Sequence, residues 1–295
     1  MKRTRLIVYG VGCHMQDITS TRSLVYYTFL LHMAKYMGLR IMLYGNGIGP
    51  ITKARNAAKA RKALNACDYI SLRDPESLAL VKRIGVDNPN VVISVDPVVS
   101  VELDEGLTVG DILPELKDVS YFAVSLRPWQ YNEPAFVEKI AEAINYVADK
   151  YALTPLLFPM HMMDMSILKD AAKRLNCEYV LLPKVYEYKS IMAIIAKAEF
   201  AICMRLHALI YAAGVGLPII GLVYDPKVAN FIAYMNETTQ IDTSDLDLTA
   251  LKAMIDGIMA NPAAAKEKIA VERERLRKLS GQDAKVAIGL LDAEM

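Results

Sequence analysis

The sequence predicts an α/β protein of two doubly wound domains that face a cleft. Short apolar runs alternate with longer helical patterns, which is typical of βα units and a parallel sheet. An acidic stretch at 102–118, which lacks a clear apolar period, interrupts the alternation. The length of 295 residues suits two domains of about 150 residues each. Ligands bind outside the carboxyl ends of parallel strands, so a site is expected there.

The first domain is expected at 1–101. The basic N-terminus precedes only four apolar residues before Gly10, which indicates a first strand and not a signal peptide, so we expect a cytoplasmic protein. Pro75 suits the first turn of a helix. The expected strands are Leu6–Tyr9, Ile41–Tyr44, Tyr69–Leu72 and Val91–Val95, and the expected helices are Ser23–Met37, Lys53–Ala66 and Pro75–Ile84.

The acidic stretch 102–118 is interpreted as a linker, 119–245 as the second domain and 246–295 as a C-terminal helical segment. In that segment Asn261 is expected to cap a helix that begins at Pro262 and runs to about Leu279. The expected strands of the second domain are Tyr121–Leu126, Thr154–Phe158, Tyr179–Leu182, Phe200–Cys203 and Pro218–Val223; its helices are Pro134–Lys150, Met165–Leu175, Lys189–Ala198, Leu206–Ala213 and Val228–Tyr234.

Composition excludes several classes of protein. The chain has 34 Lys+Arg against 33 Asp+Glu, so its near-neutral charge gives no global attraction to nucleic acid or to an acidic membrane. With 54% hydrophobic residues, the chain is not disordered. Four widely spaced cysteines form no CxxC pair, and Cys203 is expected to be a buried thiol. Glycines and Pro218 break the apolar run Phe200–Tyr224 into pieces that are too short to span a membrane.

The most informative segment is Cys203-Met204-Arg205-Leu206-His207-Ala208, which follows an expected strand and opens an apolar helix. Arg205 and His207 thus stand at the carboxyl end of a strand and at a helix N-terminus, where a carboxylate or phosphate binds well. Histidine also suits general acid or base work. The alternative is a capped core histidine with a surface arginine, which does not explain why both lie between two apolar elements.

Further cations follow other strands. Lys227, in Tyr224-Asp225-Pro226-Lys227, would stand at the same sheet edge, or it is an ordinary loop lysine. Arg73 and Arg127 each end a strand within the sequence Ser-Leu-Arg, and the alternative for Arg73 is a local pair with Asp74. Trp129 could stack on a sugar ring or simply pack.

Two glycine-rich segments, Gly10-Val11-Gly12 and Gly45-Asn46-Gly47-Ile48-Gly49-Pro50, are interpreted as turns that permit close approach of a ligand. Neither has the spacing of a dinucleotide fingerprint, so NAD is weakly supported. Gln16 and Asp17 could hydrogen-bond sugar hydroxyls or equally cap the next helix, and His161 could meet the diphosphate or base of an acceptor. With Asn46 and Trp129 they are the acceptor-binding candidates. Asp164 is expected to cap a helix, and no cluster has metal-ligand spacing.

Taken together, these motifs resemble polysaccharide pyruvyl transferases. The resemblance is carried by Arg205-Leu206-His207, Tyr224-Asp225-Pro226-Lys227, Ser71-Leu72-Arg73-Asp74 and Gly45 to Pro50, in that family's order and spacing, to about residue 240. The segment from Gly10 to Ser23 is similar to the GGGSLLQD-type segment of one branch, the bacterial enzyme that pyruvylates a secondary cell-wall polymer for S-layer anchoring. Val11, Cys13 and His14 depart from it.

The resemblance implies a fold of two Rossmann-like domains similar to GT-B glycosyltransferases. It implies transfer of the enolpyruvyl-derived group of phosphoenolpyruvate to two hydroxyls of a sugar, N-acetylmannosamine on a lipid diphosphate in the nearest branch, without metal or cofactor. It assigns catalysis to His207 and donor binding to Arg205 and Lys227, with Arg73 and Arg127 as further donor ligands. A lipid-linked acceptor needs only peripheral contact with the inner face of the cell membrane.

Relative to the family, the first domain lacks about two βα units before its first strand, so we expect an incomplete first domain with an exposed apolar edge and face. Two alternatives to the transferase stay open, and the short first domain motivates the second of them. One is a GT-B-type glycosyltransferase or epimerase that uses a nucleotide sugar, and the other is a non-catalytic truncated homologue.

Overall fold

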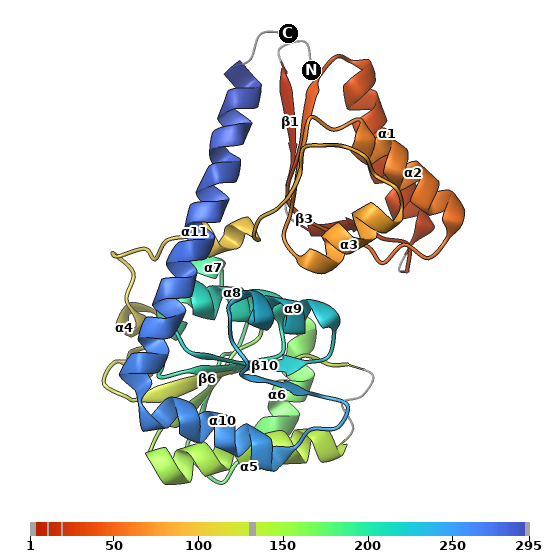
Figure 1. The fold of residues 1–295 in the computed structure, drawn as a ribbon. Helices are drawn as coiled ribbons and strands as arrows, with labels where there is room; N and C mark the ends of the chain where they lie inside the picture. The colour runs from red at the N-terminus through yellow and green to blue at the C-terminus, as the bar shows by residue number, and fades with distance from the viewer. Residues whose placement is uncertain (1–3, 11, 19, 130–133, 293–295) are drawn as a thin grey trace. The chain divides into compact units, whose positions relative to one another are not determined.

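The computed structural model describes residues 4–10, 12–18, 20–129 and 134–292. It divides into two compact units, which are described separately: unit 1 is Met1–Ser100 with Arg275–Met295, and unit 2 is Val101–Glu274 (Figure 1). The expected linker 102–118 therefore belongs to unit 2, where it forms the short helix α4 (Val109–Ile112) and a 3-10 turn. The expected C-terminal segment 246–295 is shared between the two units.

Unit 1 has a parallel sheet in the order β1-β3-β4-β5, with β2 also paired to β3. The first strands β1 and β2 lie along the same edge of β3, because β4 occupies its other edge. In the second glycine-rich segment, Gly45 to Ile48 continue strand β3 and do not form the expected turn. Val11, which belongs to the first glycine-rich segment, lies outside the described residues. The strands are β1 Leu6–Tyr9, β2 Gly12–Met15, β3 Arg40–Ile48, β4 Tyr69–Leu72 and β5 Val91–Ile93.

Helices α1 (Thr21–Tyr36), α2 (Ala54–Asn65) and α3 (Pro75–Arg83) cover one face of this sheet. The strands advance in one direction, and right-handed crossovers then put all three helices on the same side. The last part of α11 (Pro262–Asp292) lies on the other side (Figure 1). There the Tyr69 hydroxyl donates to the Asp283 carboxylate at 3.2 Å. Helix α11 thus extends beyond its expected end near Leu279.

The outer face of α1 is apolar. Its inner side packs on the sheet through Leu24, Leu31 and Ala34. At 100° per residue the exposed apolar side chains form a single stripe along the opposite side, and Val8 of β1 is also exposed. The sequence predicts an exposed apolar edge and face of the sheet, whereas this stripe lies on a helix. The stripe consists of Val25, Tyr26, Phe29, Leu30, Met33, Tyr36 and Met37.

Unit 2 has a parallel sheet in the order β11-β10-β9-β6-β7-β8. From β6 the chain advances to β7 and β8, and from β9 it advances in the opposite direction to β10 and β11. The order reverses between β6 and β9, which makes this unit doubly wound and defines a topological switch point. The sequence missed β11 because only one of its three residues is strongly apolar. The strands are β6 Tyr121–Ser125, β7 Thr154–Leu157, β8 Val180–Leu181, β9 Ala201–Cys203, β10 Ile219–Val223 and β11 Gln240–Asp242.

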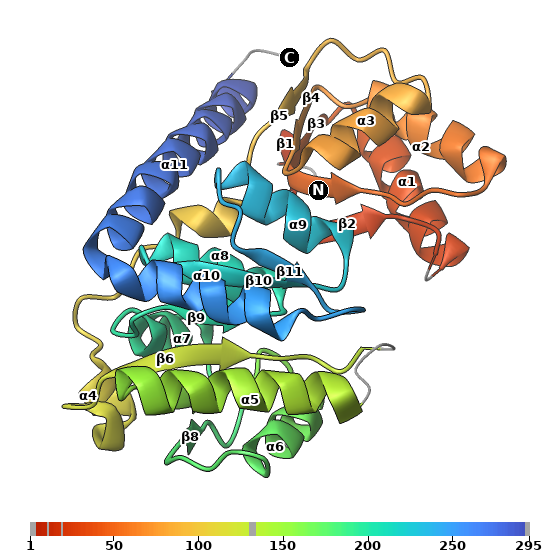
Figure 2. The same cartoon turned by 60° about the horizontal axis from the view of Figure 1, so that its bottom comes forward.

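Helices cover both faces of the sheet of unit 2 (Figures 1 and 2). The core on one side is built from apolar residues of α5, α6 and α10 against the central strands. Helices α7, α8 and α9 cover the other side. The bounds are α5 Pro134–Tyr151, α6 Met165–Ala172, α7 Tyr188–Ile195, α8 Leu206–Gly214, α9 Pro226–Tyr234 and α10 Leu248–Ala260.

The apolar segment Phe200–Tyr224 forms β9, α8 and β10, three short buried elements, as the sequence predicts. Across the described parts of the chain, every helix is too short or too polar to cross a bilayer. Cys203 is fully buried, and burial raises the pKa of its thiol far above the ordinary value. Asn261 accepts a hydrogen bond from the Ala264 N–H at 3.1 Å and so caps α11, as expected.

Candidate functional site

The candidate site lies at the carboxyl ends of β6 and β9, the two strands that flank the switch point of unit 2. Arg127 follows β6 after one apolar residue, and Arg205 follows β9 after Met204. Arg205 is the N-cap residue of α8 and has extended backbone dihedrals, φ −81° and ψ 128°. Leu206 and Ala208 are buried while His207 is exposed. The alternation turns the apolar side chains into unit 2 and leaves the imidazole accessible at a helix N-terminus, where anions bind.

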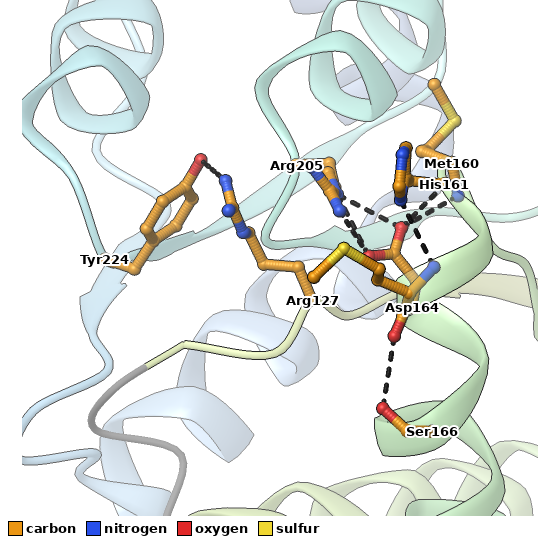
Figure 3. A network of polar contacts seen from close by, with 8 residues as sticks. Arg127, Met160, His161, Asp164, Ser166, Arg205 and Tyr224 are labelled. Carbon is orange, nitrogen blue, oxygen red and sulfur yellow. Dashed lines mark hydrogen bonds and ion pairs between the residues drawn. The ribbon is translucent and has the colours of Figure 1, made fainter. Parts of the chain in front are cut away.

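Arg127 reaches across the sheet edge to the loop after β10. Its guanidinium donates a hydrogen bond to the Tyr224 hydroxyl at 2.7 Å (Figure 3). The guanidinium carbon lies 4.6 Å from the centre of the Tyr224 ring and 4.9 Å from the centre of the Trp129 ring. The two rings meet edge to face at 4.9 Å. Cation–π contacts of this kind hold an arginine in place while it keeps its full charge.

Arg205 is paired with Asp164, which lies in the loop region after β7. Its Nε–H points at both carboxylate oxygens, at 3.2 and 3.1 Å, and its Nη2 group also bonds the carboxylate (Figure 3). The Asp164 side chain is completely buried, whereas that of Arg205 is 22% exposed. Asp164 is the N-cap residue of α6, as expected, but its side chain makes no capping bond to that helix. The carboxylate instead accepts hydrogen bonds from Arg205 and from backbone N–H groups of the preceding loop.

Lys227 and His161 also follow strands of this sheet, β10 and β7 respectively. Asp225 caps α9 by accepting from the Lys227 N–H at 3.1 Å, and the Lys227 Nζ lies 3.3 Å from the same carboxylate. That ammonium is also 5.4 Å from the centre of the Tyr224 ring. His161 is exposed, and its Nδ1 accepts from the Met163 N–H at 3.2 Å. The unit therefore brings Arg127, Arg205, His207 and Lys227 to one edge of one sheet, as their sequence context predicts.

The remaining predicted residues belong to unit 1. Arg73 pairs with the buried Asp96 at 2.8 Å and is 4.0 Å from Asp74, the partner in the alternative of a local pair. Its guanidinium lies close to Gly47, where a Cβ atom would come within 3.2 Å of Nε. Gly47 leaves room for the Arg73 side chain, which explains by packing why a glycine stands at this position of the strand.

Two of the predicted acceptor-binding residues of unit 1 have structural contacts instead. Asn46 is buried and donates through Nδ2 to the Tyr9 and Tyr44 carbonyls at 2.8 and 3.3 Å. Asp17 is buried and accepts from the Thr52 and Lys53 backbone at 2.8 and 3.1 Å, at the start of α2. These bonds account for both side chains.

The contacts of Asp17 also change its acidity. Burial favours the protonated acid, but hydrogen bonds from Asn56, Thr52 and Lys53 outweigh it and lower the pKa of the Asp17 carboxyl to about 2. Gln16, the neighbouring residue, is half-buried. The helix that Gln16 and Asp17 were thought to cap, α1, is capped by Ser20.

Sequence reasoning assigned no part in the site geometry to three residues that determine it: Asp96, Asp164 and Tyr224. Each lies far along the chain from the arginine that it contacts, by 23, 41 and 97 residues respectively. The one feature of the sequence that could have indicated these residues is their position, because each follows the carboxyl end of a strand. Across the described ranges, no group of three His, Cys, Asp or Glu residues is arranged to hold a metal ion.

Fold and site together define an α/β protein with a GT-B-like fold and a cationic edge at the switch point of its second unit. The sequence profile of polysaccharide pyruvyl transferases matches residues 2–226. The chain belongs to the polysaccharide pyruvyl transferase family, as the motifs predict. A comparison with curated proteins gives no match.

Solved structures of similar fold include UDP-GlcNAc 2-epimerases. The UDP-GlcNAc 2-epimerase from Neisseria meningitidis, bound to UDP-GlcNAc, has a TM-score of 0.64 at 14% identity over 96% of this chain and 76% of the epimerase. For a putative UDP-N-acetylglucosamine 2-epimerase from Listeria monocytogenes the TM-score is 0.66 at 14% identity, over 91% of this chain and 69% of that enzyme. For the complex of S. aureus MnaA with UDP the TM-score is 0.64 at 11% identity, over 100% of this chain and 79% of MnaA. At these identities the likeness concerns the fold, which is GT-B-like as predicted.

Proposed function

We propose that this protein transfers the enolpyruvyl-derived group of phosphoenolpyruvate to two hydroxyls of a cell-wall polysaccharide sugar and so forms a cyclic pyruvate ketal. Membership of the family supports pyruvyl transfer to a polysaccharide. The observation that carries the proposal is the convergence of Arg127, Arg205 and Lys227, together with the exposed His207, on one sheet edge of unit 2. A small, highly charged donor needs several cations around it.

The donor is held by the cations of this edge. Arg205 presents donors at the N-terminus of α8, and Arg127 keeps its charge between two aromatic rings. Lys227 contributes a flexible ammonium from the first turn of α9. The family motif also suggests Arg73, a residue of unit 1 whose charge is balanced by Asp96, as a donor ligand. No cofactor takes part in the proposed reaction.

The reaction is an addition followed by a displacement. A proton from His207 adds to the methylene carbon of phosphoenolpyruvate and makes it a methyl group, which leaves an oxocarbenium centre at C2. The first sugar hydroxyl adds to C2 and releases its proton. The second hydroxyl then forms the other C–O bond as the bond between C2 and the phosphate oxygen breaks. One hydroxyl proton restores His207, the other leaves with phosphate, and the cations stabilise the departing charge.

For the acceptor we propose lipid-linked N-acetylmannosamine, as in the branch that serves S-layer anchoring. The protein would then work in the cytoplasm, with peripheral contact at the inner face of the cell membrane. Trp129 and His161 are the acceptor-binding candidates at this edge. Gln16 is a weaker one, and the bonds of Asp17 and Asn46 favour structural roles for those two side chains.

The test is incubation with phosphoenolpyruvate and a lipid-linked or synthetic N-acetylmannosamine acceptor. We expect phosphate release that depends on the acceptor, together with an acid-labile pyruvyl adduct on the sugar by mass spectrometry. A parallel incubation with UDP-N-acetylglucosamine tests the nucleotide-sugar alternative. If neither substrate turns over with well-folded protein, the chain is a non-catalytic homologue and the proposal fails.

A further inference from the structure

Asp164 carries a carboxylate with no contact to bulk solvent. Besides Arg205, it binds the backbone N–H groups of Met160 and His161, at 3.1 and 2.9 Å. Burying an ionised carboxylate is costly unless several donors compensate for the lost water. These donors supply that compensation and anchor the carboxylate to the loop after β7. Asp164 is therefore held in place by its own loop, and the Arg205 side chain binds to it from the loop after β9.

The pair leaves part of the guanidinium available. Asp164 contacts Nε and Nη2, two of the three nitrogens of Arg205. Within the ranges that the structure describes, the third nitrogen, Nη1, forms no hydrogen bond. A guanidinium is planar and has five N–H donors in a fixed arrangement. Fixing one edge of it on a carboxylate therefore sets the direction in which the remaining donors point.

The two long contacts of the site interleave at the switch point. Arg205 and Asp164 join the loops after β9 and β7 across the end of β6, because β6 lies between those strands. Arg127 and Tyr224 join the loops after β6 and β10 across the end of β9. Figure 3 shows the two pairs side by side. Together they tie four loops in two pairs, so neither arginine depends on its own loop alone for its position.

We propose that Asp164 is a positioning residue which holds the Arg205 guanidinium with Nη1 turned toward the anionic donor, an inference that deepens the proposed function and rests on it. The carboxylate touches no substrate. Its effect on the reaction passes through Arg205, and its loss would let the long arginine side chain sample other rotamers.

The arrangement itself is tested by NMR on the full chain labelled with 15N-arginine. We expect the Nε–H of Arg205 to exchange with water at least tenfold more slowly than that of Arg22, an exposed arginine of α1. Arg205→Lys and Arg22→Lys assign the two signals. In Asp164→Asn the protection of Arg205 should be lost, whereas Asp170→Asn, which breaks only the surface pair with Lys173, should leave it unchanged. Equal exchange of Arg205 and Arg22 in the wild type would overturn the proposal without any variant of Asp164.

The effect on function is tested by a double-mutant cycle with phosphoenolpyruvate as the varied substrate. We expect Asp164→Asn to lower kcat/KM at least tenfold in the wild type and less than twofold in the Arg205→Lys background, since a lysine cannot make the bidentate pair. Effects that multiply would show that Asp164 acts on the fold in general and would overturn the proposal. If wild type turns over no phosphoenolpyruvate, the proposed function fails, while the exchange data still decide whether Asp164 positions Arg205.

Discussion

Arg127 and Tyr224 are joined by a hydrogen bond of 2.7 Å that passes over the end of β9, the strand that delivers Arg205 and His207. The contact ties the first half of the doubly wound sheet to the second at the point where their strand order reverses. The tyrosine contributes twice, through its hydroxyl and through the face of its ring. Two arginines of the site are thus held in different ways, one by a carboxylate and one by an aromatic side chain.

Tyr224→Phe removes the hydroxyl and keeps the ring. We expect unfolding free energy to fall by about 1 kcal/mol, the usual net value of one hydrogen bond. We expect kcat/KM for phosphoenolpyruvate to fall about fivefold or more, because Arg127 loses the tether that sets its direction. Tyr179→Phe, at an exposed site of the same unit, is the matched control. Equal activity of the two variants would show that the ring alone positions Arg127.

His207→Ala should abolish phosphate release and leave the protein folded. The side chain is exposed, so we expect its loss to change unfolding free energy by less than about 1 kcal/mol. Phosphate release and the melting temperature are to be measured on the same preparation, with His32→Ala in unit 1 as control. Turnover close to that of the wild type would remove His207 from the mechanism.

Gly45→Ala should destabilise unit 1 by about 2–4 kcal/mol. The residue has φ +58°, a left-handed conformation that costs a side chain about 1–2 kcal/mol. Its Cβ would also clash with Pro97 and lie 2.8 Å from the Val95 carbonyl oxygen, which adds a cost typical of overpacking. Denaturant unfolding measures the change. Gly257→Ala, in the open interior of α10, should instead stabilise by about 0.5–1 kcal/mol.

Stability should fall in acid partly because of Asp17. Its pKa is lowered from 3.8 to about 2 in the folded protein, so the folded state prefers the ionised form more than the unfolded state does. The stabilisation is fully present above about pH 4 and is lost as the pH falls toward 2. Asp17→Asn should therefore flatten the dependence of unfolding free energy on pH in this window. An unchanged slope in Asp17→Asn would contradict the assignment.

Thiol reactivity should follow burial. Cys13 is exposed, whereas Cys67 and Cys203 are buried, and burial raises the pKa of the Cys67 thiol to about 12. Since the thiolate is the reactive form, we expect an alkylating reagent near neutral pH to modify Cys13 in the native protein and to spare the two buried thiols. Peptide mapping by mass spectrometry identifies the modified cysteines. Rapid modification of Cys203 in the native state would show that β9 opens readily.

Helices and strands were predictable where local periodicity was strong. Arg205 and His207 were recognisable because an apolar strand and an apolar helix flank them, and neither element has a structural need for a cation between them. The sequence failed where a segment has no period of its own. Gly45 to Ile48 reads as a turn, yet it continues β3 because β2 and β4 supply hydrogen-bond partners on both sides.

The α/β class, most of the strands and helices, the family and the cations that end strands follow from the amino-acid order alone. Those properties depend on residues close together in the chain. Three others depend on tertiary packing: the reversal of strand order between β6 and β9, the carboxylate or ring that each arginine meets, and the support that Asp17 and Asn46 give to the backbone. The partner of Arg127 is 97 residues away and that of Arg205 is 41 residues away. A contact between side chains so distant in sequence exists only once the parallel sheet has brought the carboxyl ends of its strands to one edge.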